Sequence, residues 1–322
     1  MKKYIKISAA LGLTICGVLY AIINPIFGSV EESPVLVIAP ELLRQHVERL
    51  ANTEKPRTYD NMKALNAAAA YIKSEFKKHS EYVRAQKYKV DYREYKNIIC
   101  SFGPTDGERI IIGAHYDVCQ NQPGADDNAS GVAGILEIAR LLKSQAPKLK
   151  YRIDLVAYTL EEPPYFRSEY MGSAVHAQYL KDKGIVVKAM ICLEMIGYFS
   201  DEPKSQQYPI GLLKLFYPSR GNFITIVGKL GKGGLTRKMK RGMRAGSSID
   251  VRSISAPKII PGIDYSDHLN YWKHGYDAVM ITNTSWYRNA NYHMPTDTPE
   301  TLDYVRMAEV VKGVYWAVVN LK

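Results

Sequence analysis

Short apolar runs recur along the chain, and segments with helical spacing separate most of them. Runs that are rich in Ile, Val and Leu and bounded by turn or charged residues are typical of buried strands. We expect strands at residues 82–90, 95–102, 110–112, 152–160, 186–193, 223–227 and 278–282. Helices are predicted between them at residues 39–51, 59–79, 130–144, 172–183 and 235–244.

A final helix is expected to start where Asp297 or Thr298 caps it, with Pro299 as its first helical residue, and to run to about residue 320. Strands that alternate with helices favour an α/β fold, with a mostly parallel but mixed central sheet and helices on both faces. No repeat, low-complexity tract or long linker divides the body, so residues 35–322 are predicted to form a single domain.

The first 30 residues differ from the rest of the chain. Lys2, Lys3 and Lys6 precede a mostly apolar run at residues 7–23, which is longer than an ordinary signal-peptide core and short for a membrane-spanning helix. The lysines predict that the N-terminus stays in the cytoplasm and that the domain is exported to a periplasmic or extracellular location. The pattern leaves open whether the run is a cleaved signal or an uncleaved anchor in the inner membrane.

The composition is that of a globular protein, with 46% hydrophobic and 23% charged residues and a net charge of +11. Part of this charge is local, because seven basic residues and no acid lie between Lys229 and Arg244. We interpret this stretch either as a solvated helix face or as a contact with anionic lipid near an anchor. No motif that reads RNA or DNA accompanies it, so nucleic acid is not an expected partner.

The cysteines do not form an obvious disulfide framework. Cys16 lies in the apolar run, which leaves the odd set Cys100, Cys119 and Cys192. Cys192 falls inside an apolar strand and is predicted to be a buried free thiol. Cys100 and Cys119 could pair in an oxidising compartment.

Residues that can bind a metal follow three of the predicted strands. Because ligands gather at the carboxyl ends of the strands in an α/β sheet, we expect these side chains to converge at one edge. Two imidazoles and four carboxylates form the candidate site: His115, Asp126, Glu161, Glu162, Glu194 and His293. Asp117 lies two residues after His115 and can orient the imidazole ring without binding the metal itself.

So many carboxylates in one cleft would repel unless cations neutralise them or some stay protonated. Mixed nitrogen and oxygen ligands suit Zn²⁺, and after it Mn²⁺ or Co²⁺. Two such ions roughly 3.5–4 Å apart can share one water, lower its pKa and polarise a carbonyl group. Successive side chains of a strand point different ways, so one of Glu161 and Glu162 can bind metal while the other acts as a base. These residues alone do not say which glutamate has which role.

The same residues resemble the zinc aminopeptidases of metallopeptidase family 28, a group that also contains glutaminyl cyclases and glutamate carboxypeptidase. The resemblance covers nearly all of the chain after the N-terminal segment and implies the zinc-exopeptidase fold, of the phosphorylase/hydrolase-like type. Its signature stretches appear in the family's order: His115-Tyr116-Asp117, Gly124 to Gly131, Glu161-Glu162, Glu194, Ser266-Asp267-His268 and His293.

The resemblance also implies a two-zinc site. Its ligands would be His115 and Glu194 for one ion, Glu162 and His293 for the other, and Asp126 as the bridge between them. Glu161 would be the general base, and Asp117 would orient His115. A strained cis peptide bond is expected after Asp126. Many bacterial aminopeptidases of this kind carry Asp where this chain has Glu194, and the longer side chain puts the second ion in question.

The surroundings of these ligands give weaker signals. Asp267 and His268 are expected behind the ligands or in the pocket wall. We interpret an aromatic cluster near the last ligand as the wall of a hydrophobic side-chain pocket or as core packing: Trp272, Trp286, Tyr287 and Tyr292. The remaining histidines are expected at the surface or in the core: His46, His79, His176 and His274.

Our hypothesis from the sequence is an exported, zinc-dependent aminopeptidase that acts on peptides with a free N-terminus and is tethered to a membrane if residues 7–23 are retained. A first alternative is a glutaminyl-peptide cyclotransferase of the same fold, which would hold a single zinc. A second alternative is a catalytically silent binding or scaffold domain. Relatives of that last kind typically lose ligands or the base, whereas this chain keeps all six positions.

Overall fold

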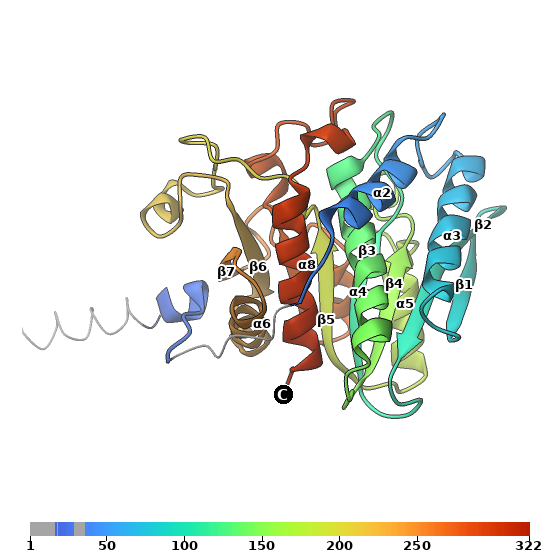
Figure 1. Ribbon diagram of the computed structural model, residues 1–322, viewed down its shortest axis with the longest axis horizontal. Coiled ribbons are helices and arrows are strands. Elements are labelled where there is room, and N and C mark those ends of the chain that lie inside the picture. Colours follow the sequence, from blue (N-terminus) through green and yellow to red (C-terminus); the bar gives the residue numbers. More distant parts are fainter. Residues whose placement is uncertain (1–16, 18, 29–35) are drawn as a thin grey trace, which may run out of the picture.

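The computed structural model of the protein describes residues 17, 19–28 and 36–322 (Figure 1). Most of the apolar run at residues 7–23 therefore lies outside the described residues. The rest of the chain is built on an eight-stranded sheet with the order β1-β2-β4-β3-β5-β8-β6-β7. The strands are β1 Val83–Val90, β2 Arg93–Phe102, β3 Arg109–His115, β4 Arg152–Tyr158, β5 Val187–Glu194, β6 Phe223–Lys229, β7 Asp250–Ala256 and β8 Ala278–Thr282.

The sheet is mixed and mostly parallel, as the sequence predicts. The pairs β3–β4, β3–β5, β5–β8 and β6–β7 are parallel. The pairs β1–β2, β2–β4 and β6–β8 are antiparallel. Strand β7 was not expected from the sequence. Its residues alternate between buried and half-buried positions, and the polar residues Asp250, Arg252, Ser253 and Ser255 interrupt it, so it lacks a continuous apolar run.

Helices cover both faces of the sheet (Figure 1). One face packs against α2, α3, α4, α6 and α8, and the other packs against α5 and α7. Their bounds are α2 Pro40–Ala51, α3 Met62–Lys77, α4 Gly131–Gln145, α5 Gly172–Asp182, α6 Gly233–Gly246, α7 His268–Lys273 and α8 Tyr304–Val319. The short α7 was not predicted, because six residues are too few to show a helical period.

The start of the last helix differs from the expectation. Pro299–Thr301 forms a separate 3₁₀ turn, and α8 begins only at Tyr304. Its N-cap is Asp303, whose carboxylate accepts a hydrogen bond from the amide of Arg306 at 2.9 Å. Asp297 does not cap this helix, because it is buried and contacts the amides of Asp126 and Asp127 instead.

The cysteines of the domain are buried free thiols. This confirms the expectation for Cys192. Cys100 lies in the core within β2 and does not pair with Cys119, which lies in the loop after β3.

The arrangement of the strands decides where a site can form. Strands β4, β3 and β5 are neighbours and run in the same direction, so their carboxyl ends emerge side by side at one edge. Next to them, the face of β8 and β6 that is turned away from α6 and α8 is covered by loops, which leaves room for a cavity. Among the described residues, no helix has the length and apolarity that a membrane crossing requires.

Candidate metal centre and active site

The first half of the site lies at the end of β3. His115 is the last residue of this strand and is almost fully buried. Its Nε2 atom lies 3.2 Å from Oδ1 of Asp127 and 3.4 Å from Oε2 of Glu194, the last residue of β5. Two neighbouring parallel strands thus bring the imidazole and the glutamate together, as expected.

The second half lies on the other side of Asp127. Nε2 of His293 is 3.2 Å from Oδ2 of Asp127 and 3.3 Å from Oε2 of Glu162. The two oxygens of one buried carboxylate therefore face two different imidazoles, and each imidazole also faces its own glutamate. This geometry is that of a bridging carboxylate between two ligand pairs.

The structure corrects the expected position of the bridge from Asp126 to Asp127. The Asp126 carboxylate is directed away from the imidazoles and accepts hydrogen bonds from the amides of Gly197 and Tyr198 and from the side chains of Asn283 and Asn289, at 2.8–3.2 Å. The cis peptide bond likewise follows Asp127 and not Asp126. Two adjacent aspartates look equivalent in sequence, and only the path of the turn decides which one faces the cluster.

Glu161 and Asp117 lie on the third side of the cluster. Oε2 of Glu161 is 4.0 Å from Nε2 of His115, close enough to act on a molecule bound there. The Asp117 carboxylate accepts the amide protons of Glu161 and Glu162 at 3.2 and 3.1 Å, which fixes the backbone that carries both acids. Nδ1 of His115 is nearer to the carbonyl oxygen of Asp117, at 3.2 Å, than to its carboxylate, at 3.7 Å.

Burial and mutual repulsion perturb these acids. Burial raises the pKa of Glu162 to about 7, with a further contribution from Asp127. Burial also raises the pKa of Glu161 well above its ordinary value, although His115 acts in the opposite sense. Burial opposes ionisation of Asp127, but its contacts with His115 and His293 outweigh this effect and its pKa is lowered. The site therefore needs positive charge, from protons on the imidazoles or from bound cations.

The donor set fits divalent cations. Nε2 of His293 forms a hydrogen bond with neither nearby carboxylate in spite of the short distances, and Oε1 of Glu162 has no hydrogen-bond partner. A metal ion requires nitrogen and oxygen atoms that point to one place without being hydrogen-bonded to one another. Two sets of donor atoms each lie within 4.8 Å of one another on the His115 side: His115, Asp127 and Glu194, and His115, Glu161 and Glu162. Nitrogen and carboxylate oxygen donors suit zinc.

Residues that the sequence did not identify hold the ligands in place. The hydroxyl of Ser266 donates to Oε2 of Glu194 at 2.6 Å. Asp297 accepts the amide protons of Asp126 and Asp127 at 2.9 and 3.1 Å, and burial raises its pKa to about 8. The sequence places Ser266 in a signature stretch and Asp297 at the start of a helix. No sequence signal predicts that Ser266 contacts Glu194 or that Asp297 contacts Asp126 and Asp127. They act by fixing ligand geometry, a role that is common behind metal ligands.

The remaining predicted site residues take different places. Asp267 is fully buried beside the cluster, where burial raises its pKa to about 7. His268 lies farther off, with Nε2 2.8 Å from the carbonyl oxygen of Ile263 and its ring edge-on to Trp272. Tyr292 stacks on the His293 imidazole, with ring centroids 3.8 Å apart.

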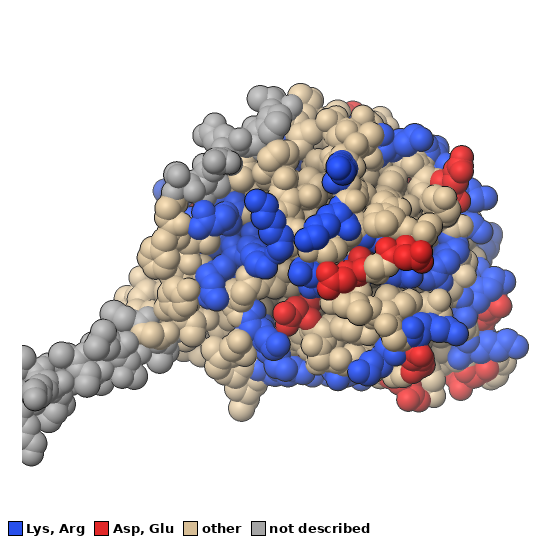
Figure 2. Space-filling model, turned by 90° about the horizontal axis from the view of Figure 1, so that it is seen from below, with Lys and Arg blue, Asp and Glu red and all other residues tan. Residues whose placement is uncertain are grey.

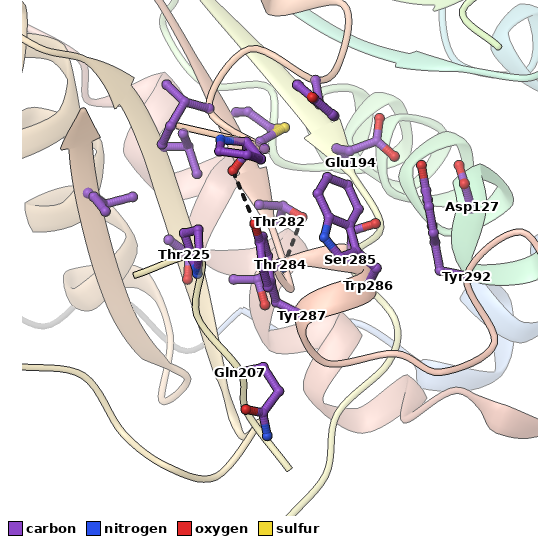
Figure 3. Close-up of a pocket in the computed structure, with 18 of the residues that line it drawn as sticks. Asp127, Glu194, Gln207, Thr225, Thr282, Thr284, Ser285, Trp286, Tyr287 and Tyr292 are labelled. Atoms are coloured by element: carbon purple, nitrogen blue, oxygen red, sulfur yellow. Dashed lines mark hydrogen bonds between the residues drawn. The ribbon is translucent and has the colours of Figure 1, made fainter. Parts of the chain in front are cut away.

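A cavity of about 240 Å³ opens directly from the cluster (Figure 3). Asp127 and Glu194 lie at one end, and Thr225 of β6 lies toward the other, with Trp286 between them. Its wall is mostly apolar and comes from strands β6, β7 and β8 and from the loops that follow β4, β5, β7 and β8. Large side chains of this wall are Phe166, Tyr208, Leu213, Tyr217, Phe223, Ile254, Ile263, Tyr265, Met280, Trp286, Tyr287 and Tyr292. Trp272 is a core residue outside this wall, and its indole donates to the carbonyl of Ala278.

Known proteins resemble this chain along most of its length. It is 48% identical over 292 residues to the uncharacterized protein YfbL of Escherichia coli strain K12, with 88% of this chain and 89% of that protein covered. It is 26% identical over 241 residues to leucine aminopeptidase 1 of Ajellomyces capsulatus strain G186AR. That alignment covers 71% of this chain and 56% of the fungal protein, so the chain spans little more than half of that relative.

Solved structures share the fold. LapB from Legionella pneumophila superposes with a TM-score of 0.70 at 24% identity, covering 88% of this chain and 73% of that chain. A glutaminyl cyclase from Bacteroides thetaiotaomicron superposes with a TM-score of 0.67 at 18% identity, covering 90% and 100% of the two chains.

The mixed sheet, with imidazoles and carboxylates gathered at its strand ends, defines the fold class of the zinc exopeptidases and glutaminyl cyclases. Within that class, the family model of peptidase family M28 matches residues 97–318. The chain belongs to peptidase family M28, a family of hydrolases. Its fold is the one that the sequence predicts.

Proposed function

We propose that the protein is a zinc-dependent aminopeptidase that removes the N-terminal residue from peptides by means of two metal ions. The observation that carries the proposal is the position of Asp127 between two imidazole–glutamate pairs, His115 with Glu194 and His293 with Glu162. A single-ion site would not need a carboxylate that faces both pairs. The aminopeptidase relative at 26% identity supports the same activity.

The residues of the chain have separable roles in this reaction. The two pairs and Asp127 would hold the ions, which when bound supply a water of lowered pKa and polarise the scissile carbonyl group. Glu161 would act as the general base toward an attacking water and would return the proton to the leaving amine, as its place beside His115 allows. Burial raises the pKa of the Glu161 carboxyl above its ordinary value, which is the direction that favours return of the proton to the leaving amine.

The surplus of buried acids also explains the choice of a free N-terminus. Four carboxylates (Asp127, Glu161, Glu162 and Glu194) line this end of the cavity, and Asp267 is buried behind them. An α-ammonium group is the one cation that every unblocked peptide brings, and its attraction to buried carboxylates exceeds that in water. We therefore expect that an acetylated N-terminus abolishes binding.

The apolar cavity would take the side chain of the first residue. Its volume of about 240 Å³ is below the roughly 300–1,000 Å³ of pockets that enclose whole drug-sized ligands, so it suits one large side chain. Leu, Met and Phe at the first position are the expected substrates, because Tyr265, Trp286 and Tyr292 offer apolar and aromatic walls.

Aminoacyl-anilides test this function. The zinc-loaded protein is expected to release aniline from Leu- and Phe-anilide, and a chelator is expected to stop the release. Glu161→Gln should lower kcat by about 10²–10⁴-fold while both ions remain bound. Retained activity in Glu161→Gln, or no release by protein with its zinc content verified, would count against the proposal.

A glutaminyl cyclase is the second candidate, because a solved cyclase covers 90% of this chain with the same fold. In that reaction the α-amine of an N-terminal Gln attacks its own γ-carboxamide carbon, and ammonia leaves without the addition of water. Zinc content and product mass separate the two candidates: one ion with a pyroglutamyl product supports a cyclase, and two ions with a freed amino acid support the aminopeptidase. A scaffold domain would show neither product.

A further inference from the structure

Cys119 lies at the His293 side of the metal centre. It is 5% exposed and belongs to the loop that follows β3. Its Sγ atom, a ring nitrogen of His293 and a carboxylate oxygen of Glu162 all lie within 4.8 Å of one another. The loop is held in this position by Arg57, whose carbonyl oxygen accepts the amide proton of Val118 and whose guanidinium donates to the carbonyls of Tyr116 and Pro123.

The neighbours of this thiol are themselves short of partners. Glu162 is only 4% exposed, and its Oε1 atom has no hydrogen-bond partner. Nε2 of His293 also forms no hydrogen bond, although two carboxylates are nearby. Cys100 and Cys192 have no such setting, since Cys100 lies in the core and Cys192 contacts the hydroxyl of Ser266.

We propose that Cys119 is an additional ligand of the metal ion held by His293 and Glu162, an inference that rests on the proposed two-metal function. Zinc binds thiolate at about 2.3 Å and imidazole at 2.0–2.1 Å in a tetrahedral arrangement, so ligand atoms of one ion lie within about 4 Å of each other. The three residues need only small side-chain shifts to meet that condition. On binding, the thiol gives its proton to solvent and the Sγ lone pair bonds to the ion.

A thiolate makes the two halves of the centre unequal. The His293 side gains a soft ligand, whereas the His115 side has only nitrogen and oxygen donors. The His293 side is therefore expected to select zinc over manganese and magnesium.

The test uses the full chain, stripped of metal and reloaded with zinc or with cobalt. X-ray absorption at the zinc edge should show a sulfur neighbour at about 2.3 Å, and the cobalt form should show a thiolate-to-cobalt band in the near ultraviolet. Both signals should vanish in Cys119→Ser, and the zinc affinity of the weaker site should fall by at least about 10-fold. Cys100→Ala, a change in the core away from the ligands, should keep both signals.

Each outcome decides the matter. Absence of sulfur scattering in the zinc-loaded wild type, or its persistence in Cys119→Ser, overturns the proposal. Cys119→Asp guards against misfolding, since it keeps a ligand and should bind zinc without the sulfur signal. Chelator-sensitive hydrolysis without a sulfur signal refutes the cysteine ligand but leaves the aminopeptidase function standing. A sulfur signal without hydrolysis supports the cysteine ligand and contradicts the aminopeptidase function.

A second and independent feature is the docking of residues 20–27 on α6 and β7. The carbonyl oxygen of Ile23 accepts hydrogen bonds from the Ser253 hydroxyl at 2.7 Å and from the Lys240 ammonium at 3.3 Å. Asn24 is fully buried, donates to the Ser255 hydroxyl at 2.9 Å and accepts from Arg237 at 3.3 Å. Through these contacts residues 20–27 pack against the domain as part of it.

The face around this segment combines cations with exposed aromatic rings. Phe27 is 69% exposed and stacks on Tyr20, with ring centroids 6.3 Å apart, and the guanidinium of Arg237 lies over the Tyr20 ring. Lys232 and Lys238 of the same basic stretch are also exposed, Lys232 facing Asp277 at 3.4 Å and Lys238 donating to the carbonyl oxygen of Lys322 at 2.6 Å. Figure 2 shows basic side chains gathered on the face that carries α6. Aromatic rings beside lysine and arginine are typical of surfaces at a membrane–water interface.

We infer that this face rests on an anionic lipid bilayer. Residues 20–23 belong both to the apolar run at residues 7–23 and to the docked segment, so α6 lies beside the end of that run. The seven basic residues between Lys229 and Arg244, with no acid among them, match the charge of anionic headgroups. The basic helix is thus only partly a solvated face, because Lys240 is buried against Ile23 and Asn24.

Hydrogen exchange tests this inference on the full chain in vesicles. We expect residues 233–246 to exchange several-fold more slowly in phosphatidylglycerol–phosphatidylcholine vesicles than in pure phosphatidylcholine vesicles, and high salt should remove the difference. Lys232→Gln with Lys238→Gln should also remove it. Lys63→Gln with Lys77→Gln, which changes exposed lysines of α3, should leave it intact. Equal exchange in both vesicles, or slowing that salt does not reverse, overturns the inference.

Discussion

Two adjacent aspartates have opposite roles at the centre of the site. The Asp127 carboxylate faces both imidazoles, whereas the Asp126 carboxylate ties together the loops after β5 and β8 through Gly197 and Asn283. Both are fully buried and both are acids, so charge and burial do not separate them. Their partners do.

Replacement of each aspartate by Asn should therefore give different results. We expect Asp127→Asn to lower metal affinity by more than the 10–100-fold typical of changes behind the ligands, and to abolish hydrolysis. Asp126→Asn should keep metal binding within about 10-fold while lowering the free energy of unfolding, because an amide NH₂ would then face the amide donors of Gly197 and Tyr198. Calorimetric metal titration and denaturant unfolding measure the two effects. The reverse pattern would restore Asp126 as the bridge.

The hydroxyl of Ser266 holds the Oε2 atom of Glu194 by a hydrogen bond of 2.6 Å. Ser266→Ala should weaken metal binding by about 10–100-fold, because Glu194 would lose the hydrogen bond that orients it. Zinc competition with a fluorescent chelator measures the change. Ser144→Ala, at an exposed position near the end of α4, serves as the control, and an equal loss in the control would refute the orienting role.

At the scale of elements, Arg57 fixes the loop that follows β3. Its guanidinium is completely buried and donates to the carbonyls of Leu50, Tyr116, Pro123 and Gly124. Burial lowers its pKa to about 10, so it remains charged at neutral pH. A fork of donors reaches several carbonyls at once, which an ammonium group does not do.

Arg57→Lys should therefore destabilise the protein although it keeps the charge. We expect a loss of about 2–3 kcal/mol, as for a buried charged donor whose acceptors are left unpaired, together with weaker metal binding. Urea unfolding and zinc titration test both effects. Exposed Arg49, which lies over the Tyr71 ring, provides the matched control Arg49→Lys, with an expected change below about 0.5 kcal/mol.

Asp154 lies near the start of β4, at the end of this strand that is farthest from the metal centre, and joins β4 to its two neighbouring strands. Its carboxylate accepts hydrogen bonds from Ser101 at 2.6 Å, Arg109 at 2.8 Å and Arg152 at 3.0 Å. Burial opposes its ionisation, but these partners outweigh burial and its pKa is lowered. A carboxyl group with a lowered folded-state pKa stabilises the fold above its ordinary value of 3.8, and that contribution disappears as the pH falls through the folded-state pKa.

Asp154→Asn should lower the free energy of unfolding by about 1–3 kcal/mol at pH 7, and the difference from wild type should shrink below about pH 4. Thermal or urea unfolding at several pH values provides the measurement. A difference that is the same at pH 3 and at pH 7 would show that the charge of Asp154 is not the stabilising feature.

For the whole molecule, the buried acids couple folding to metal binding. Without cations the carboxylates around Asp127 repel one another, and burial raises the pKa of several of them. An ion that binds only the folded state stabilises it by about 2.7 kcal/mol at 100 times its Kd. Chelation should therefore lower Tm by roughly 5–10 °C for a domain of this size, and zinc should restore it. No change in Tm with chelator would contradict a structural contribution of the ions.

The pattern of apolar runs determined the fold class, most of the helices and strands, and the edge of the sheet where the ligands meet. It could do so because buried parallel strands need continuous apolar sequence, and their carboxyl ends necessarily point to one edge. The pattern missed β7, which has no continuous apolar run, and the six-residue α7. It also placed the start of the last helix too early, because Asp297 has the sequence context of a cap but contacts Asp127 instead.

Chemical type alone predicted the residues His115, Glu161, Glu162, Glu194 and His293, since imidazoles and carboxylates after buried strands have few other uses. Only the tertiary structure distinguished Asp127 from Asp126, brought Cys119 next to His293, and set Ser266 and Arg57 behind the ligands. The physical reason is that sequence spacing fixes which side chains can share a face of one element. Contacts between loops depend on how the turns close across the whole sheet, and no local pattern records that.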